Sequence, residues 1–168
     1  HLIALGHRNI GYVGSCRNED RYIGYMDTLK KNNLDMIPEY VVETDQTERE
    51  GYEAMEQLLK TDDCPTGIYC ANDITAVGML KYLRRCRNLY FTPSIIASDN
   101  IEEAQFTKPM LTTVALPREE MGRFAIYLLL DRMKGGHTGV VRMELSGKLL
   151  IRNSCSHVSE SFWSDYCI

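Results

Sequence analysis

The 168-residue sequence has no long apolar run and no excess of positive charge. Its longest uninterrupted apolar stretch is residues 124–130, far shorter than the roughly 20 residues that a membrane-spanning helix needs. Lys and Arg number 19 against 23 for Asp and Glu, so the net charge is −4. A protein that binds DNA on its own needs a basic face. We therefore expect no membrane partner and, for this chain alone, no direct contact with nucleic acid.

The sequence also lacks the cysteine spacings of metal sites. Its six cysteines include no C-x-x-C pair, and no histidine lies at zinc-finger spacing from them. A chain of this length buries enough apolar surface to fold without disulfides, so we expect reduced thiols, no metal and a cytoplasmic location. A secreted protein with a disulfide framework is the less favoured alternative. The chain begins at His1 without a visible signal peptide, which is consistent with a cut from a longer protein.

Motifs of nucleotide-binding and hydrolytic enzymes are absent as well. The sequence has no G-x-x-x-x-G-K-[ST], G-x-G-x-x-G or H-E-x-x-H segment, and Gly14-Ser15-Cys16 lacks the second glycine of a nucleophile elbow. His7 precedes a predicted strand, where we expect a hydrogen-bonded structural histidine rather than a base. Because no nucleophile can be paired with a base, we predict no catalytic residue, no cofactor and no enzyme activity.

Short apolar runs alternate with amphipathic segments along most of the chain, which is typical of an α/β fold. Strands are expected at 9–14, 40–43, 67–71, 94–98 and 111–115. Helices are expected at 19–32, at 47–59, around Ala76 to Leu83, and at 118–134. Thr47 and Glu50 fit a capping box at the start of the second helix. This alternation predicts parallel strands with crossover helices, that is, a doubly wound, mostly parallel sheet.

The end of the chain is less regular. Segments 140–145 and 148–152 are interpreted as closing strands joined by a turn at Ser146 and Gly147. The tail, residues 153–168, is rich in serine and has no Lys or Arg. Phe162 and Trp163 offer the tail a way to pack on the body, but we expect it to be mobile.

Polar side chains follow the strands of the predicted sheet, at the edge where open α/β sheets bind ligands. Arginine donates in a fork, aspartate accepts and asparagine does both, which suits a small ligand with several hydroxyl groups. The residues that follow the first four strands are Ser15, Cys16, Arg17 and Arg21, then Asp45 and Gln46, then Asn72 and Asp73, then Asp99 and Asn100. Those predicted to bind the ligand are Arg21, Asn72, Asp99, Gln46, Ser15 and Asp73.

Each of these residues also has a structural interpretation that the sequence leaves open. Asp73 begins a helix and is expected first of all to be its N-cap. Asn72 suits a turn as well as a ligand amide, and Asp99 with Asn100 suits a simple turn. Arg21 is unusual because a cation near a helix N-terminus is unfavourable, so a neighbouring acid or a functional demand would explain it.

The same residues lie in segments that resemble the LacI/GalR family of bacterial transcription regulators, in the C-terminal part of the effector-binding region. Their order and spacing match over about 150 residues. The main segments are Gly6-His7-Arg8, Arg21-x-x-Gly24-Tyr25, Gly51-Tyr52-x-Ala54-Met55, Ala71-Asn72-Asp73-Ile74-x-Ala76-x-Gly78, Ser98-Asp99-Asn100, Leu111-Thr112-Thr113-Val114 and Leu150-Ile151-Arg152-Asn153-Ser154.

The resemblance implies a periplasmic-binding-protein-like core of two lobes, which holds a sugar or another small effector between them. It also implies a helix-turn-helix headpiece that binds operator DNA. The family's ligand-contacting arginine, asparagine and aspartate fall on Arg21, Asn72 and Asp99. The family often has an aromatic residue that stacks on the ligand where this chain has Gln46. That difference argues against a purine or a simple pyranose.

The resemblance further implies a division of the chain. Residues 1–114 correspond to the C-terminal lobe, and 115–136 to a strand and helix that cross into an N-terminal lobe largely missing here. Residues 137–152 return to the C-terminal lobe, and 153–168 form the tail. The crossing helix would expose an apolar stripe, which we expect to pack on a second copy, as in a homodimer, or on residues upstream of His1. The stripe consists of Met121, Phe124, Ala125, Leu128 and Leu129.

These observations favour an effector-sensing fragment of a cytoplasmic transcription regulator. Its expected partners are a small effector, a carbohydrate by this resemblance, and operator DNA through the missing headpiece. The alternative is a solute-binding protein for sugar transport with the same fold; the six cysteines and the family-like segment at 150–154 count against it. A third hypothesis, an enzyme that uses Asp99 as nucleophile or base, lacks a partner residue.

Overall fold

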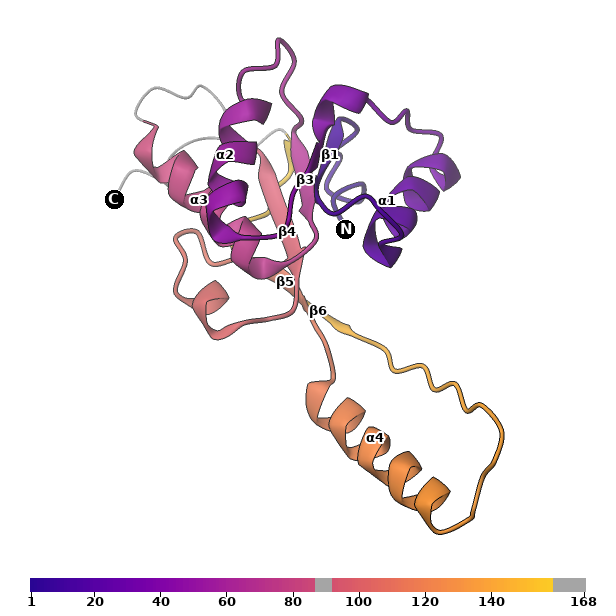
Figure 1. Ribbon diagram of the computed structural model, residues 1–168. Helices are drawn as coiled ribbons and strands as arrows, with labels where there is room; N and C mark the ends of the chain where they lie inside the picture. The colour runs from indigo at the N-terminus through magenta and orange to yellow at the C-terminus, as the bar shows by residue number, and fades with distance from the viewer. Residues whose placement is uncertain (87–91, 159–168) are drawn as a thin grey trace.

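The computed structural model of the chain describes residues 1–86 and 92–158, which form one six-stranded sheet with helices on both faces (Figure 1). The strand order across the sheet is β2-β1-β3-β4-β5-β6. The strands are β1 (Ile10–Gly14), β2 (Val41–Glu43), β3 (Gly67–Cys70), β4 (Ser94–Ser98), β5 (Thr112–Ala115) and β6 (Lys148–Leu150). β1 to β5 are parallel and β6 is antiparallel to β5. The predicted doubly wound, mostly parallel sheet is confirmed.

The order of the strands decides where a ligand can enter. From β1 the chain first adds β2 on one side and then β3 on the other, so the connections leave in opposite directions between β1 and β3. Open α/β sheets bind ligands at such a switch point, beyond the carboxyl ends of the strands. Parallel pairing in register, with Tyr12 opposite both Val41 and Tyr69, brings these strand ends to one edge.

Three helices cover the sheet. α1 (Asp20–Lys31) lies on one face, and α2 (Glu48–Leu58) and α3 (Asp73–Arg85) lie together on the other (Figure 1). Two short 3-10 turns, η1 (Pro38–Tyr40) and η2 (Glu102–Gln105), complete the connections. The expected capping box starts α2: Glu50 N donates to Thr47 Oγ1, and Thr47 N donates to the Glu50 carboxylate. The described cysteines at 16, 64, 70, 86 and 155 are free thiols.

The face under α2 and α3 is the larger core, and two glycines allow these helices to cross closely. A Cβ at Gly78 would overlap the carbonyl oxygen of Glu48, and one at Gly51 would overlap that of Thr75. The close crossing packs the helices onto the sheet and fixes the start of α3. The buried residues of this core include Val13, Met55, Leu58, Ile68, Met79, Leu83, Ile95 and Leu111.

The face under α1 is built on aromatic rings. The ring centroid of Tyr12 lies 5.2 Å from that of Tyr22, 5.4 Å from that of Tyr25 and 5.8 Å from that of Tyr69. Tyr25 also donates its hydroxyl to the Ile10 carbonyl at 2.8 Å, which anchors α1 to β1. This cluster places the first turn of α1 against the end of the sheet.

The expectation that His7 is structural is confirmed. It is fully buried, and its ring nitrogens bond Thr66 Oγ1 and the Ser156 carbonyl, both at 3.0 Å. Ser154 is also buried and joins the chain's end to β4 and β5: its hydroxyl donates to the Ile95 carbonyl and accepts from Thr112 N. The expected mobility of the tail is therefore wrong for residues 153–156. Phe162 and Trp163 lie outside the described residues.

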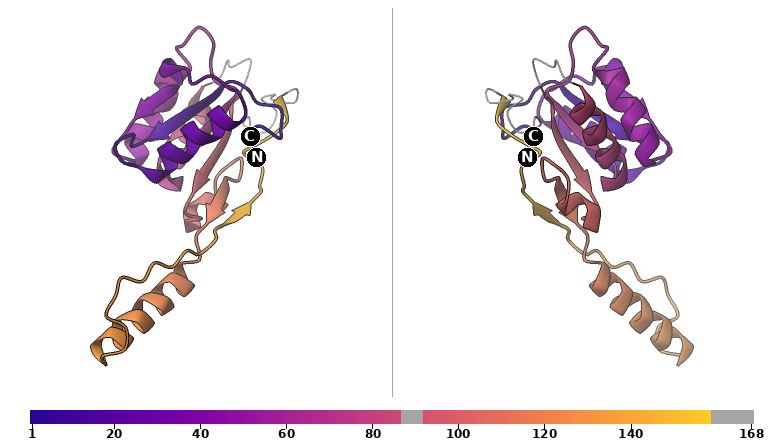
Figure 2. Two further views of the ribbon diagram at one scale, coloured as in Figure 1. Left: turned by 90° about the vertical axis from the view of Figure 1, so that its right-hand side faces the viewer. Right: turned by 90° about the vertical axis from the view of Figure 1, so that its left-hand side faces the viewer.

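α4 (Arg118–Met133) leaves the lobe as an arm (Figure 1). It follows β5, and the chain returns through an extended segment to β6; the two views of Figure 2 show this helix beyond the end of the sheet, away from α1, α2 and α3. None of its residues is buried. The expected apolar stripe is therefore solvent-exposed in this chain, with Met121 49% and Leu129 59% exposed.

The two expected closing strands are only half right. Residues 140–145 form no strand, which corrects that prediction, and Val140 is 98% exposed. An alternating sequence becomes a strand only where another strand can pair with it, and this segment runs alongside none of the described strands. The other closing strand exists as β6, shorter than expected, and it pairs with β5 instead.

Candidate functional site

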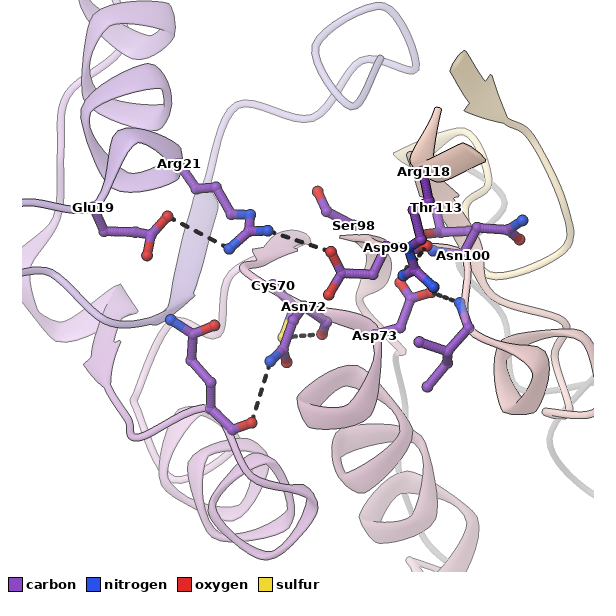
Figure 3. A network of polar contacts seen from close by, with 12 residues as sticks. Glu19, Arg21, Cys70, Asn72, Asp73, Ser98, Asp99, Asn100, Thr113 and Arg118 are labelled. Atoms are coloured by element: carbon purple, nitrogen blue, oxygen red, sulfur yellow. Dashed lines mark hydrogen bonds and ion pairs between the residues drawn. The ribbon is translucent and has the colours of Figure 1, made fainter. Parts of the chain in front are cut away.

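Arg21 and Asp99 form the centre of the candidate site. Arg21 lies in the first turn of α1, just beyond β1, and Asp99 follows β4. The Arg21 Nη2 atom lies 3.3 Å from Asp99 Oδ1, and Nη1 lies 3.5 Å from Glu19 Oε1 (Figure 3). The Arg21 side chain is 30% exposed and the Asp99 side chain 24%, so solvent reaches both charges. The nearby acids explain why a cation is tolerated at this helix N-terminus.

Asn72 lies beyond the end of β3, between these two residues in strand order. Its Oδ1 accepts from Thr75 N at 3.1 Å and so caps α3. The N-cap is therefore Asn72, and the expectation that Asp73 is the cap is wrong by one residue. The Asn72 Nδ2 donates to the Gln46 carbonyl at 3.2 Å, which leaves its second N–H for a further acceptor (Figure 3).

Gln46 contacts Asn72 of the candidate site through its backbone carbonyl. It has a positive φ of 61°, and its N–H donates to Thr44 Oγ1. These features form the tight turn between β2 and α2, which directs the Gln46 carbonyl toward Asn72. The loops after β2 and β3 are thus joined at the rim by one side chain.

Asp99 and Asn100 form a strained turn whose backbone N–H groups are hydrogen-bonded. Their φ angles are 119° and 51°, in the region that non-glycine residues rarely adopt, at a cost of about 1–3 kcal/mol each. Asp99 N donates to the Val114 carbonyl at 2.9 Å, and Asn100 N donates to Thr113 Oγ1 at 3.3 Å. Ile101 N donates to Asp73 Oδ2 at 3.0 Å. The turn is therefore more than a simple connection, because it fixes the direction of the Asp99 carboxylate.

Asp73 supports this turn from inside the lobe and does not reach the open edge of the sheet. It is fully buried, and its Oδ1 accepts from Thr113 Oγ1 at 2.6 Å while Oδ2 accepts from Ile101 N. Burial raises the pKa of this carboxyl above its usual range, and the two hydrogen bonds oppose the shift. The prediction that Asp73 contacts the ligand is corrected on this geometry, because both of its oxygens are used inside the protein.

Ser15 lies at a neighbouring hollow instead of beside Arg21. Its carbonyl accepts from the Tyr12 hydroxyl at 3.0 Å. The hollow has a volume of about 380 Å³ and is lined by Ser15, Arg17, Glu43, Thr44, Asp45 and Glu50. Its walls carry three carboxylates and one guanidinium, so it is a polar extension of the rim on the β2 side.

Cys70 lies next to Asn72 and is a buried thiol. It is fully buried and contacts the Asn72 carbonyl at 3.4 Å. Burial raises the pKa of the Cys70 thiol to about 12, so it carries no thiolate at neutral pH. Within residues 1–86 and 92–158, no three histidine, cysteine or acidic side chains gather as metal ligands, and no helix is long and apolar enough to span a membrane.

Sequence reasoning missed three residues that organise the Asp99 turn. Thr113 bridges it to Asp73, Arg118 donates to the Asp99 carbonyl at 2.6 Å, and Arg152 donates to Asn100 Oδ1 at 2.7 Å. The signal available was weak: Arg152 and Thr113 lie in segments shared with the resembling family, but nothing in those segments points to position 99. Only the fold brings them together.

Known proteins are similar to this chain over most of its length. The family of periplasmic binding protein-like domains matches residues 1–155. The chain belongs to this family. Among curated relatives, the transcriptional repressor CytR of Escherichia coli K12 is 37% identical over 160 residues, and the repressor PurR of Haemophilus influenzae PittGG is 32% identical over 166. These matches cover 92% and 94% of the chain but only 47% and 49% of the two relatives, so the chain spans about half of their length.

Solved structures agree with this family assignment. A LacI regulator from Bacillus cereus subsp. cytotoxis is 26% identical with a TM-score of 0.85, over 93% of this chain and 57% of that one. A LacI-family regulator from Enterococcus faecium, solved with bound ribose, is 27% identical with a TM-score of 0.78, over 94% and 60%. A CelR regulator in complex with cellobiose is 29% identical with a TM-score of 0.83, over 92% and 49%. The resemblance to the effector-binding region of LacI-family regulators is therefore confirmed, and the chain is consistent with effector sensing.

Proposed function

We propose that the chain senses a small carbohydrate for a bacterial DNA-binding regulator. The observation that carries the proposal is the Arg21–Asp99 pair at the edge of the sheet, next to the Asn72 amide at the switch point. Charged and amide groups of this kind satisfy several hydroxyls at once, because the arginine donates, the aspartate accepts and the asparagine has a spare N–H. The ribose and cellobiose found in two structural neighbours support a carbohydrate.

Gln46 narrows the class of ligand. The position after Asp45 carries no aromatic ring, so a flat face of a purine or pyranose has no stacking partner there. Hydrogen bonds at the rim would then provide most of the recognition. We expect the ligand to be small, rich in hydroxyls and in contact with Arg21, Asn72 and Asp99, with the Gln46 loop and Ser15 at the margin.

DNA contact is assigned to a part of the protein outside this chain. The net charge of −4 disfavours phosphate binding by these 168 residues, whereas a sensor need not touch DNA. In this proposal a helix-turn-helix headpiece binds the operator, the full protein acts in the cytoplasm as a homodimer, and the chain itself has no enzyme activity. Ligand binding would bias the headpieces between arrangements that do and do not fit DNA.

The same proposal assigns α4 to a second lobe. Residues 1–114 would form one lobe, 115–136 the crossing strand and helix, 137–152 the return and 153–168 the tail. The exposed apolar residues on α4 support this division, because soluble proteins rarely leave so many exposed on one helix. The other lobe or a second copy would cover them.

The test is a binding screen on the full-length protein. D-ribose, cellobiose and a panel of other pentoses, hexoses and nucleosides are added in a thermal-shift assay, and each compound that binds is measured by calorimetry. Binding to a DNA fragment from upstream of the protein's own gene is then measured with and without that compound. We expect at least one sugar to bind and to change the DNA affinity.

Two results would reject the proposal. The first is that no compound in the panel stabilises the protein. The second is a bound sugar with no DNA binding in any condition; this outcome, together with a signal peptide on the full-length protein, would favour solute binding for transport. Turnover of a bound sugar would restore the enzyme hypothesis.

A further inference from the structure

Two arginines hold the Asp99 turn, one at the start of the arm and one just beyond the strand by which the chain returns to the lobe. Arg118 is the first residue of α4, directly after the outgoing strand β5, and its Nη2 donates to the Asp99 carbonyl at 2.6 Å. Arg152 follows the returning strand β6, and its Nη2 donates to Asn100 Oδ1 at 2.7 Å. Neighbouring residues of one turn are thus bound by the first residue of the arm and by a residue that follows the returning strand. Figure 3 shows Arg118 beside Asp99, Asn100 and Thr113.

The turn depends on such external contacts. Two successive non-glycine residues with positive φ persist only where their surroundings impose that conformation. The backbone N–H groups are held from inside the lobe by Val114, Thr113 and Asp73, as described above. The Asp99 carbonyl is held by Arg118 at the start of the arm, and the Asn100 side chain is held by Arg152, just beyond β6, where the chain has returned to the lobe. The direction of the Asp99 carboxylate therefore depends on contacts from the lobe and on a contact from the arm.

We propose that Arg118 and Arg152 are positioning residues that couple the orientation of the arm to the ligand-contacting carboxylate of Asp99. β5 and β6 are paired, with Thr113 opposite Leu150, so the two connections move together. A rotation of the arm then pulls on the Asp99 carbonyl and on Asn100, and it changes how Asp99 faces Arg21. Equilibrium coupling is reciprocal, so a ligand that fixes Asp99 also restricts the arm. This inference rests on the proposed function for its biological meaning, but the coupling itself is testable without a ligand.

The two arginines differ in how cleanly they can be removed. Arg152 is partly buried and also donates to the Leu111 carbonyl at 2.8 Å, so its loss would disturb the lobe. Arg118 is exposed. Within the described residues its guanidinium donates to one acceptor, the Asp99 carbonyl. Arg123 lies on the same helix, is exposed, and forms no hydrogen bond or ion pair within the described residues. Arg118 is therefore the test residue and Arg123 its matched control.

The first experiment is hydrogen exchange, followed by mass spectrometry, on the full-length protein without ligand. The amides of Asp99, Asn100 and Ile101 are all hydrogen-bonded, so their exchange reports on the turn. We expect Arg118→Met to speed their exchange about three- to tenfold, as the loss of one supporting hydrogen bond implies. Arg118→Lys keeps a donor, so the exchange rates of residues 99–101 in this variant should be closer to those of the wild type. Arg123→Met should change nothing at 99–101, and α2 should exchange at the wild-type rate in every variant.

The reciprocal experiment starts from the turn. Asn100→Gly removes the acceptor of Arg152 and tolerates the φ of 51° at this position, and we expect faster exchange in β6. A contact that only stabilises the turn would reach β5, where the Val114 carbonyl accepts from Asp99 N, but would leave β6 unchanged. The proposal is overturned if Arg118→Met leaves the exchange of residues 99–101 unchanged, or if Asn100→Gly leaves the exchange of β6 unchanged. Neither measurement uses a ligand, so a failed sugar screen would reject the proposed function without affecting this result.

Discussion

The guanidinium of Arg21 reaches over the carboxyl end of β3 to Asp99, which lies 78 positions further along the chain, with 3.3 Å between Nη2 and Oδ1. The contact joins the loops after β1 and β4 above the Asn72 amide. A ligand hydroxyl that approaches here meets a donor and an acceptor of opposite charge at once.

Asp99→Asn tests the acceptor. The amide keeps the size of the side chain but loses its charge and one acceptor oxygen, so we expect the best sugar to bind about 10- to 100-fold more weakly. Calorimetry on the full-length protein measures this change. Glu56→Gln is the control, because Glu56 forms an exposed ion pair with Lys60, just past the end of α2. Equal affinity of wild type and Asp99→Asn would remove Asp99 from the site.

Two changes at Asn72 separate stability from binding. Asn72→Ala removes the cap of α3 and should lower the free energy of unfolding by about 1 kcal/mol. Asn72→Asp keeps an oxygen for Thr75 N but loses the donor to Gln46, so it should retain most of the stability and lose sugar affinity. Urea denaturation and calorimetry measure the two effects. If Asn72→Asp binds sugar like the wild type, Asn72 acts only as a cap.

Gly78→Ala tests the close crossing of α2 and α3. The added methyl group would overlap the Glu48 carbonyl, so the helices must separate, and overpacking of this kind costs about 1–3 kcal/mol. Gly24→Ala on α1 is the matched change, because a Cβ there meets nothing within 4 Å. It should stabilise the protein by about 0.5–1 kcal/mol through helix propensity. Similar unfolding curves for the two variants would contradict the close-crossing argument.

The buried His7 predicts a pH dependence of stability. Burial lowers the pKa of His7 below 6.5, although the bond to the Ser156 carbonyl opposes the shift. Below pH 6.5 the unfolded chain therefore binds a proton that the folded chain resists. The free energy of unfolding is highest above this pH and falls as the pH drops toward the folded pKa.

His7→Gln should flatten this dependence between pH 7.5 and 5.5, and it should cost about 1–3 kcal/mol at pH 7.5 because buried partners lose their bonds. His1→Gln, at an exposed position, should keep the wild-type slope. Urea denaturation at the two pH values compares them. An unchanged slope in His7→Gln would mean that other groups control the stability in this range.

Much of the lobe follows from local signals in the sequence. β1, β3 and β4 were predictable because their short apolar runs end at or just before Gly14, Asn72 and Asp99, and the capping box at Thr47 fixes the start of α2. The N-cap of α3 was not predictable from the sequence, because asparagine and aspartate both cap helices well. The extended backbone of Asn72, with φ −140°, decides in favour of position 72.

The site and the arm show where sequence reasoning ends. Open α/β sheets bind ligands beyond the carboxyl ends of their strands, and this rule selects Arg21, Asn72 and Asp99 from the strand ends alone. It also selects Asp73, whose burial depends on β5 approaching from 40 positions away. Residues 140–145 alternate like a strand, but strand formation depends on a pairing partner, and the sequence of this segment does not contain that information.

The length of α4 gives the contact at its first residue a mechanical consequence. With 16 residues the helix is about 24 Å long, so a rotation of about 10° at Arg118 displaces its far end by about 4 Å. The helix begins beside the Asp99 carbonyl, so under the proposed coupling a small shift at this turn becomes a large movement at the far end of α4.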